Sequence, residues 1–348
     1  MFQVQVLQSW FMFWHFVLEV PTGVVADFFG RKRSVLIGLA FYGLGFLLYG
    51  IFPNFFAFLF FEFLLALGVA LMSGADKALF FDSLKDIGEE KESKKYFGKA
   101  LSWKLMGFAI SAPVGSYIGG KFGLNIPMLV SSLSILVAFV FISRFKEPRR
   151  YEVEDQAKKY FDVFKNGIKF VWNNKAVRML SFKGILVFAS GYFIIWLYQP
   201  LLIKLDVPIM YFGYFHALLV FSQVIISNNF GFFEKKFGVD NYLKFSGIIV
   251  GLFFLIVAFV PNIFTAILFL IFAGGFGLTY MEFVQAHLNE EIPSNIRATI
   301  LSTIGFFSSM FLFGANPIIG YLADRSVILA IGVVGIFPIL TLFIRKRK

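Results

Sequence analysis

The chain has 348 residues, of which 58% are hydrophobic and only 15% are charged, and 51 of them are Phe. Soluble domains are about 45–50% apolar and about 25% charged, so this composition excludes an ordinary water-soluble protein. Cys is absent and only 3 His are present, which excludes a disulfide framework and gives no reason to expect a metal centre. The net charge of +11 could indicate a nucleic-acid ligand, but the basic residues stand between apolar runs.

Eleven apolar runs follow one another along the chain, each close to the roughly 20 residues that an α-helix needs to cross a bilayer. They lack the alternating pattern of a membrane barrel, so the sequence predicts an all-α polytopic membrane protein. We do not expect the first run to be a cleaved signal peptide, because no basic segment precedes it. The runs cover residues 3–26, 34–52, 54–75, 100–120, 126–145, 179–203, 209–230, 241–260, 262–285, 299–321 and 326–344.

The loops between these runs differ in charge from one side of the predicted membrane to the other. Alternate loops carry nearly all the Lys and Arg, whereas the opposite loops have only Lys121, Lys204 and Arg325. Because positively charged loops stay in the cytoplasm, we expect a protein of the cytoplasmic membrane with its basic loops and C-terminus inside. Topology and anionic lipid then account for the net charge, and no nucleic-acid partner is expected.

Residues 146–178 interrupt the apolar runs. They separate an N-terminal part with five spans, residues 1–145, from a C-terminal part with six, residues 179–348. A helical wheel places apolar and polar residues on opposite faces, which is typical of a helix in the membrane interface. We interpret this segment as a cytoplasmic amphipathic linker, with a regulatory role as the alternative. The apolar face comprises Ala157, Tyr160, Phe161, Phe164, Ile168, Val171 and Trp172.

A glycine-rich and charged turn follows the first span. Gly23 would allow two helices to approach closely, and Gly30 would allow a tight turn. Asp27 could accept hydrogen bonds from backbone N–H groups or pair with Arg31. Fixed charges between two helices would form a conformational latch that opens when the two halves move. The alternative is that the positive charges only anchor the loop in the cytoplasm, which does not explain the spacing of Gly and Asp. The residues of this signature are Gly23, Asp27, Gly30, Arg31, Lys32 and Arg33.

This spacing resembles the signature loop between the second and third helices of the major facilitator superfamily, in a prokaryotic branch with a Pro-Thr-Gly variant. The resemblance implies a transporter with two halves of six helices, alternating access and no cofactor. In that family the signature follows the second helix, so this chain begins where that helix would begin. We expect the first helix to be encoded upstream, with a genuine fragment as the alternative. Segments similar to the same branch are residues 73–84, 198–201, 292–302 and 320–325.

Glu62 lies roughly 12 Å inside the third span, at 1.5 Å per residue from its outer end. Insertion scales put the cost of a charged residue at the centre of a membrane helix at about 2.5–3.5 kcal/mol, so such a residue calls for an explanation. Glu62 could bind a cation or carry a proton; the alternative is a protonated carboxyl bonded to a neighbouring helix. Many proton-coupled relatives carry Arg here, so the resemblance does not extend to their coupling chemistry.

His15 and Glu19 form a second candidate for proton coupling. They are one helical turn apart in the first span and therefore share a face, just before Pro21. A histidine and a carboxylate can share a proton near neutral pH. The structural alternative, which we favour, is that Glu19 bonds the backbone or the basic loop.

A polar-aromatic cluster in the sixth span is the candidate wall of a substrate cavity. Aromatic rings with a few polar groups suit an apolar or cationic ligand, although such residues also anchor helices at membrane interfaces. Gln223 and Asn316 are weaker cavity candidates, for which hydrogen bonds between helices are expected. The cluster comprises Tyr192, Trp196, Tyr198 and Gln199.

The sequence thus predicts a secondary active transporter that moves a small, amphipathic molecule by alternating access. Efflux is favoured by the resemblance, and coupling to H⁺ is expected through Glu62 or the pair His15 and Glu19. We expect a monomer in the bilayer that is not an enzyme and has no catalytic residues or metal ligands. Three alternatives stay open. They are a solute uptake carrier, a membrane-embedded enzyme, and a truncated protein that does not transport.

Overall fold

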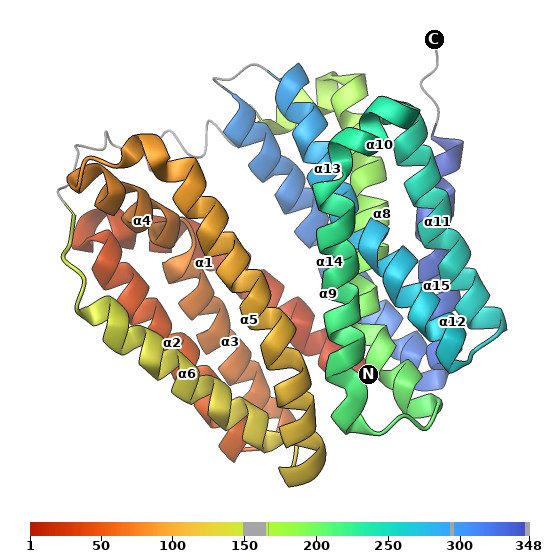
Figure 1. Cartoon of the computed structure of the whole chain (residues 1–348), viewed down its shortest axis with the longest axis horizontal. Helices are drawn as coiled ribbons and strands as arrows, with labels where there is room; N and C mark the ends of the chain where they lie inside the picture. The colour runs from red at the N-terminus through yellow and green to blue at the C-terminus, as the bar shows by residue number, and fades with distance from the viewer. Residues whose placement is uncertain (149–164, 166, 293–295, 345–348) are drawn as a thin grey trace. The chain divides into compact units, whose positions relative to one another are not determined.

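The computed structural model describes residues 1–148, 165, 167–292 and 296–344, and each element in these ranges is helical (Figure 1). A helix or an interrupted helix lies over each of the eleven predicted spans. Eight of the described helical segments are long and apolar enough to cross a membrane. The prediction of an all-helical protein with many spans is therefore confirmed.

Two compact units make up the chain. The N-terminal unit comprises Gln3–Gly107 and Ile118–Tyr160, and the C-terminal unit comprises Met1–Phe2, Phe108–Tyr117 and Phe161–Lys348. The predicted division of the chain at residues 145 and 178 stays a prediction.

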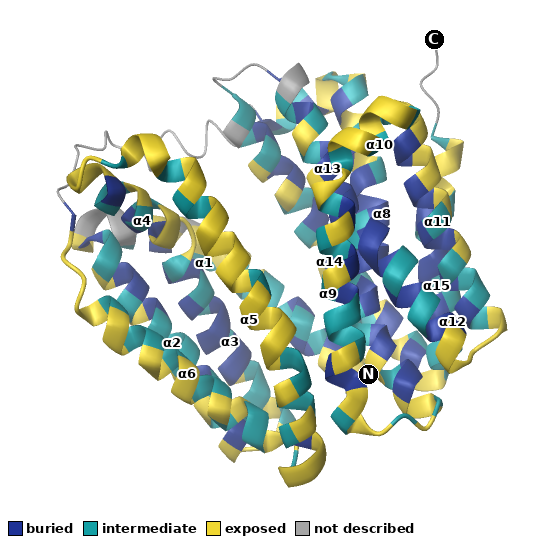
Figure 2. Ribbon diagram, viewed as in Figure 1, coloured by how far each residue is buried: buried dark blue, intermediate teal, exposed yellow. Residues whose placement is uncertain are grey.

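In the first part of the chain, α2 packs lengthwise against both α3 and α6. Gly38 and Gly68 permit the α2–α3 contact, because a Cβ added to either would lie 2.8 Å from the carbonyl oxygen of the other. None of the residues of α6 is buried although the helix is mostly apolar (Figure 2), so its apolar side chains suit contact with lipid. The elements are α1 (Phe2–Phe29), α2 (Arg31–Ile51), α3 (Phe55–Met72), α4 (Ala75–Asp86), η1 (Glu90–Glu92), α5 (Ser93–Phe122) and α6 (Asn125–Ser143).

In the C-terminal unit, α8 forms the core and is buried along most of its length. It packs against α13 and α15, and a Cβ added to Gly191 would lie 2.5 Å from the carbonyl carbon of Gly277. The elements are α8 (Lys175–Lys204), η2 (Ile209–Tyr211), α9 (Phe212–Asn228), α10 (Phe230–Phe237), α11 (Val239–Phe259), α12 (Ile263–Leu268), η3 (Phe269–Gly274), α13 (Gly275–Glu291), α14 (Arg297–Arg325), α15 (Val327–Leu340) and η4 (Thr341–Phe343).

One span of this unit is irregular in the middle. Between α12 and α13 the backbone forms a π-helical turn, η3, which ends at Gly274. A Cβ on the next residue, Gly275, would lie 2.6 Å from the side chain of Ile226 on α9. The glycines therefore let the widened turn pack against α9, and π-helical turns within membrane helices often accompany functional sites.

The end of the predicted linker packs onto the C-terminal unit. Residue 165 and residues 167–173 are helical, and Gly167 lies against Thr299 and Thr303 of α14. Val171 is buried, whereas Trp172 is 67% exposed. Only part of the predicted apolar face therefore packs against other residues of the protein. The predicted face positions Ala157, Tyr160, Phe161 and Phe164 lie outside the described residues.

Candidate functional site

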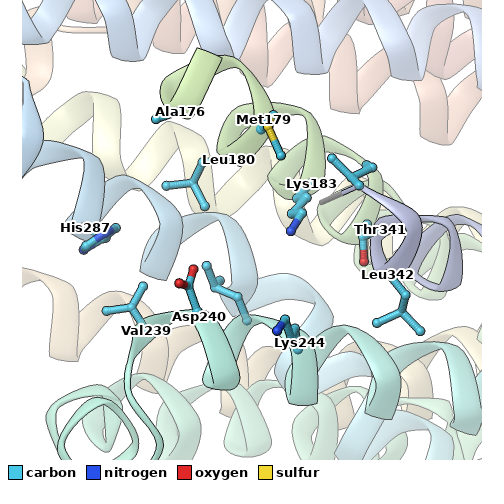
Figure 3. Close-up of a pocket in the computed structure, with 12 residues that line it drawn as sticks. Ala176, Met179, Leu180, Lys183, Val239, Asp240, Lys244, His287, Thr341 and Leu342 are labelled. Carbon is cyan, nitrogen blue, oxygen red and sulfur yellow. The ribbon is translucent and has the colours of Figure 1, made fainter. Parts of the chain in front are cut away.

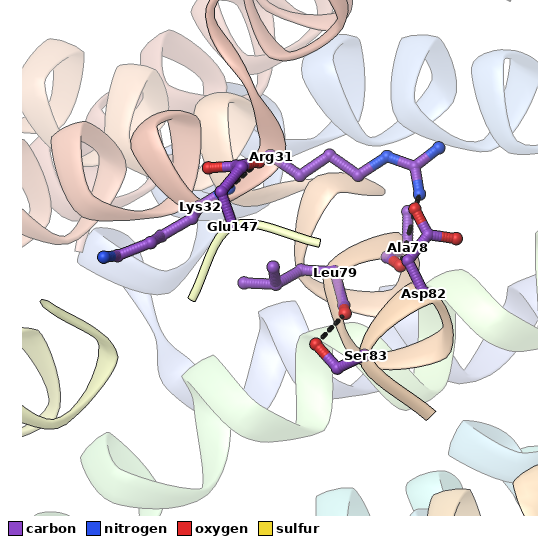
Figure 4. Close-up of polar contacts among 7 residues, drawn as sticks. All are labelled: Arg31, Lys32, Ala78, Leu79, Asp82, Ser83 and Glu147. Carbon is purple, nitrogen blue, oxygen red and sulfur yellow. Dashed lines mark hydrogen bonds and ion pairs between the residues drawn. The ribbon is translucent and has the colours of Figure 1, made fainter. Parts of the chain in front are cut away.

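The signature turn is held by an ion pair within the N-terminal unit. Gly30 separates α1 from α2 with φ at 105°, a conformation that side chains rarely adopt. The turn places Arg31 at the first position of α2, where Nη1 pairs with the carboxylate of Asp82 on α4 (Figure 4). The same guanidinium nitrogen donates a hydrogen bond to the carbonyl oxygen of Ala78 at 3.3 Å. The predicted tight turn at Gly30 is thus present.

A second carboxylate contacts the same helix end. The backbone N–H of Lys32 donates to Oε1 of Glu147 at 3.2 Å, and Glu147 follows α6 in the chain. Carboxylates are favourable at the amino end of a helix, because the backbone N–H groups there have no partner within the helix. The start of α2 is therefore bound to α4 on one side and to the segment after α6 on the other.

The expectations for Gly23 and Asp27 are not tested by the described contacts. Gly23 is on an exposed face of α1, and no described atom lies within 4 Å of a Cβ placed on it, so a close helix contact at Gly23 stays a prediction. The acid that pairs with Arg31 is Asp82, brought near by the turn of α4, while the side chain of Asp27 lies outside the described residues. Arg33 is exposed.

Glu62 is buried between α2 and α3, with 6% of its surface exposed. The hydroxyl of Tyr49 on α2 donates a hydrogen bond to Oε1 of Glu62 at 2.6 Å. The Tyr49 ring also stacks on Phe58, with 4.4 Å between the centroids, and this contact fixes the hydroxyl beside the carboxyl. This hydrogen bond is the contact with a neighbouring helix that the structural interpretation of Glu62 requires. It also leaves a carboxyl that can take up or release a proton, and a role in coupling stays a prediction.

His15 and Glu19 are not joined by any hydrogen bond or ion pair among the described contacts of α1. The His15 ring lies over Phe11, with 6.0 Å between the centroids, and Glu19 is exposed. Proton sharing between the two residues stays a prediction.

In the C-terminal unit, the aromatic residues of α8 reach polar groups on two other helices. Nδ2 of Asn316 on α14 donates to the hydroxyl of Tyr192 at 3.3 Å, so the hydrogen bond between helices expected of Asn316 is present. Trp196 lies one turn further along α8, with its ring 6.3 Å from that of Tyr192. Its Nε1 is buried and has no hydrogen-bond partner among the described residues.

A second polar contact lies nearer the end of α8. The Tyr198 hydroxyl and Nδ1 of His216 on α9 are 3.4 Å apart, and Nε2 of Gln199 lies 3.4 Å from the same hydroxyl. Tyr198 is buried, whereas Gln199 is exposed. Within the predicted cluster, Tyr192 thus contacts α14 and Tyr198 contacts α9.

Sequence reasoning missed His216. It is one of only 3 His in the chain and stands in an apolar run, which by itself marks an unusual polar group inside the membrane. Gln223, by contrast, donates to the carbonyl oxygen of Leu219 on its own helix at 3.3 Å, so the hydrogen bond between helices expected of it is not seen. Within the described residues, no cluster of three or more His, Cys, Asp or Glu side chains could hold a metal ion.

Comparison with known proteins assigns the chain to a family. The model of the Major Facilitator Superfamily matches residues 1–315. The chain therefore belongs to this superfamily of membrane transporters and is not an enzyme.

Two relatives give the same result. The chain is 25% identical over 322 residues to YxaM of Bacillus subtilis (strain 168), an uncharacterized MFS-type transporter, covering 86% of this chain and 76% of YxaM. It is 22% identical over 229 residues to another uncharacterized MFS-type transporter, MJ1560 of Methanocaldococcus jannaschii, covering 64% of this chain. The match spans 56% of that archaeal protein.

Solved structures show the same fold. The D323A mutant of the nucleoside transporter NupG superposes with a TM-score of 0.78 at 14% sequence identity, over 98% of this chain and 89% of NupG. A second structure of NupG gives a TM-score of 0.77 at 14% identity, over 99% and 88% of the two chains. The expected major-facilitator-like fold is confirmed.

Proposed function

We propose that this transporter exports a small amphipathic molecule across the cytoplasmic membrane in exchange for protons. Its site would open to one side of the membrane at a time. The observation that most supports a ligand of this kind is the pair of polar contacts that α8 makes inside an apolar unit, Tyr192 with Asn316 and Tyr198 with His216.

The chemistry of these contacts fits a partly polar ligand. Binding sites for small molecules are mostly apolar walls with a few placed polar groups. The rings of Tyr192 and Trp196 supply the wall, and they can also attract a cation. The buried Nε1 of Trp196 is a donor that a ligand oxygen could accept. A hydrophilic sugar or a bare ion would leave most of this surface unused.

Glu62 is the proposed proton carrier. A buried carboxyl is costly when ionised, so its protonation can follow whether the protein around it is wet or dry. The hydroxyl of Tyr49 at 2.6 Å stabilises the ionised form once the proton leaves. Coupling requires this proton exchange to be linked to substrate movement, and substrate-dependent pH change in proteoliposomes measures that link.

The signature contacts are proposed to brace the N-terminal unit during the transport cycle. Arg31, Asp82 and Glu147 all belong to that unit, and together they tie the start of α2 to α4 and to the segment after α6. A unit braced in this way can move as one body when access alternates.

Flux in vesicles of known sidedness tests the proposed direction. A fluorescent lipophilic cation would be added outside inverted and right-side-out membrane vesicles that are energised with a pH gradient. Export predicts accumulation in inverted vesicles that contain the protein, with none in vesicles from cells without it. Accumulation only in right-side-out vesicles would contradict export.

An uptake carrier is the second candidate. The fold is shared with NupG, which is described as a nucleoside transporter, and the donor and acceptor groups near His216 could also bind a nucleobase. Radiolabelled uridine in the same vesicles separates the two: saturable uptake into right-side-out vesicles would replace the export proposal with this one.

A further inference from the structure

A cavity of about 530 Å³ opens at one end of the C-terminal unit, apart from the polar-aromatic cluster (Figure 3). Side chains of α8, α11, α13 and η4 converge on it from different directions. The cavity is far from the candidate substrate residues along α8, because Lys183 and Tyr198 are separated by roughly 22 Å at 1.5 Å per residue. The polar side chains that line it are Lys183, Asp240, Lys244, His287 and Thr341.

The cavity lies where several basic segments meet. The helices α8 and α11 begin at this end and the described chain ends here at Ile344. The charge pattern of the loops assigns this end to the cytoplasmic face of the membrane. The headgroups of the inner leaflet would therefore lie at the level of the cavity, an inference that rests on the proposed orientation and not on the direction of transport.

The charges of the lining favour an anion. Lys183 is half-buried and lines the cavity from α8. Lys244 and Asp240 line the facing side from α11 and are both exposed. The lining therefore includes two ammonium groups and one carboxylate.

The rest of the lining is apolar, which distinguishes a lipid from a soluble anion. Met179, Leu180, Leu243 and Leu342 stand beside the two lysines. A soluble phosphate compound would leave these side chains without a partner, whereas the glycerol backbone and upper acyl chains of a phospholipid would cover them. Basic pockets between helices on the cytoplasmic side suit anionic lipid headgroups.

We propose that this cavity binds the headgroup of an anionic phospholipid of the inner leaflet. Lys183 and Lys244 hold the phosphate, and the apolar lining covers the start of the acyl chains. Asp240 opposes the binding of a negative headgroup and so limits its strength. Occupancy ties α8, α11 and η4 together at the membrane surface.

Native mass spectrometry of the purified full chain tests this site. The protein in detergent would be titrated with phosphatidylglycerol or with phosphatidylcholine of the same acyl chains. We expect selective retention of phosphatidylglycerol, and roughly tenfold weaker retention for each lysine removed, in Lys183→Gln and Lys244→Gln. Asp240→Asn should retain phosphatidylglycerol more strongly than the unaltered chain. Lys91→Gln with Lys94→Gln is the matched control, because both lysines are exposed on the predicted cytoplasmic side of the N-terminal unit.

Three results would overturn the proposal. They are equal retention of the two lipids, retention of phosphatidylglycerol that is unchanged in Lys244→Gln, and full competition by glycerol phosphate at the same concentration. The last would assign the cavity to a soluble anion. Lys244 is exposed, so Lys244→Gln decides the matter even if Lys183→Gln does not fold.

Discussion

Arg31 at the start of α2 pairs with Asp82 on α4, across 51 positions of sequence (Figure 4). Both side chains are largely shielded, with 29% of the Arg31 side chain and 14% of the Asp82 side chain exposed. An ion pair shielded in this way contributes more than an exposed one, because water and salt screen it less.

Breaking this pair should destabilise the N-terminal unit and slow transport. We expect Arg31→Gln and Asp82→Asn each to lower the free energy of unfolding by about 1–3 kcal/mol, because each leaves a shielded charge without its partner. The double variant should cost less than the sum of the two. Unfolding in mixed detergent measures the free energy of unfolding of the two single variants and the double variant. The control is Arg33→Gln, at an exposed position of the same helix. Additive losses would show that the two side chains do not interact.

The bond between Tyr49 and Glu62 gives a second stability prediction. Tyr49→Phe removes the only hydroxyl that the described contacts give to the buried carboxyl, and we expect a loss of about 1–3 kcal/mol. Thermal unfolding in detergent measures the effect, with Tyr211→Phe as the matched control at an exposed site. A melting temperature equal to that of the control would mean that the carboxyl has another partner.

Substrate affinity should depend on the contact between Tyr198 and His216. If the ligand binds beside this contact, Tyr198→Phe and His216→Gln should each raise the apparent KM roughly tenfold, as expected for the loss of a buried hydrogen bond. Tyr214→Phe makes the same chemical change at an exposed position of α9 and should leave the KM unchanged. The initial rate of substrate flux in vesicles is the measurement. Equal KM values in all three variants would place the ligand elsewhere.

The orientation can be tested without removing any native thiol, because the chain has no Cys. Asn54→Cys lies in a loop predicted to face outward and Lys91→Cys in one predicted to face the cytoplasm. A maleimide that cannot cross membranes should label the first variant in intact cells and the second only after lysis. The reverse pattern would invert the topology.

The sequence was sufficient for the helical architecture, because the period and length of apolar runs report the membrane directly. It was less accurate at helix ends. The helix predicted over 100–120 begins at Ser93 and the one over 179–203 begins at Lys175. Hydropathy marks the part of a helix that lies in lipid, while the helical backbone continues into the polar interface.

Side-chain partners were harder to predict than spans. Glu62 was recognised as unusual, but its partner Tyr49 is apparent only once α2 and α3 are packed together. The sequence offers Asp27 as one possible partner of Arg31, but Asp82 is a partner that only the position of α4 reveals. His216 is noticeable in the sequence because His is rare in this chain, but its neighbour Tyr198 lies in a different span. Such pairs depend on tertiary contacts, which a single sequence does not specify.

Proton movement during transport is the most direct test of Glu62 as the proton carrier. Proteoliposomes would contain a pH-sensitive dye and the full chain, and a lipophilic cation would be added on one side. Glu234→Gln, at an exposed position of α10, is the control for Glu62→Gln. Proton exchange predicts a change in internal pH that depends on substrate in the unaltered chain and in the control, and none in Glu62→Gln. Substrate flux without any change in internal pH, or a pH change that survives Glu62→Gln, would contradict the account.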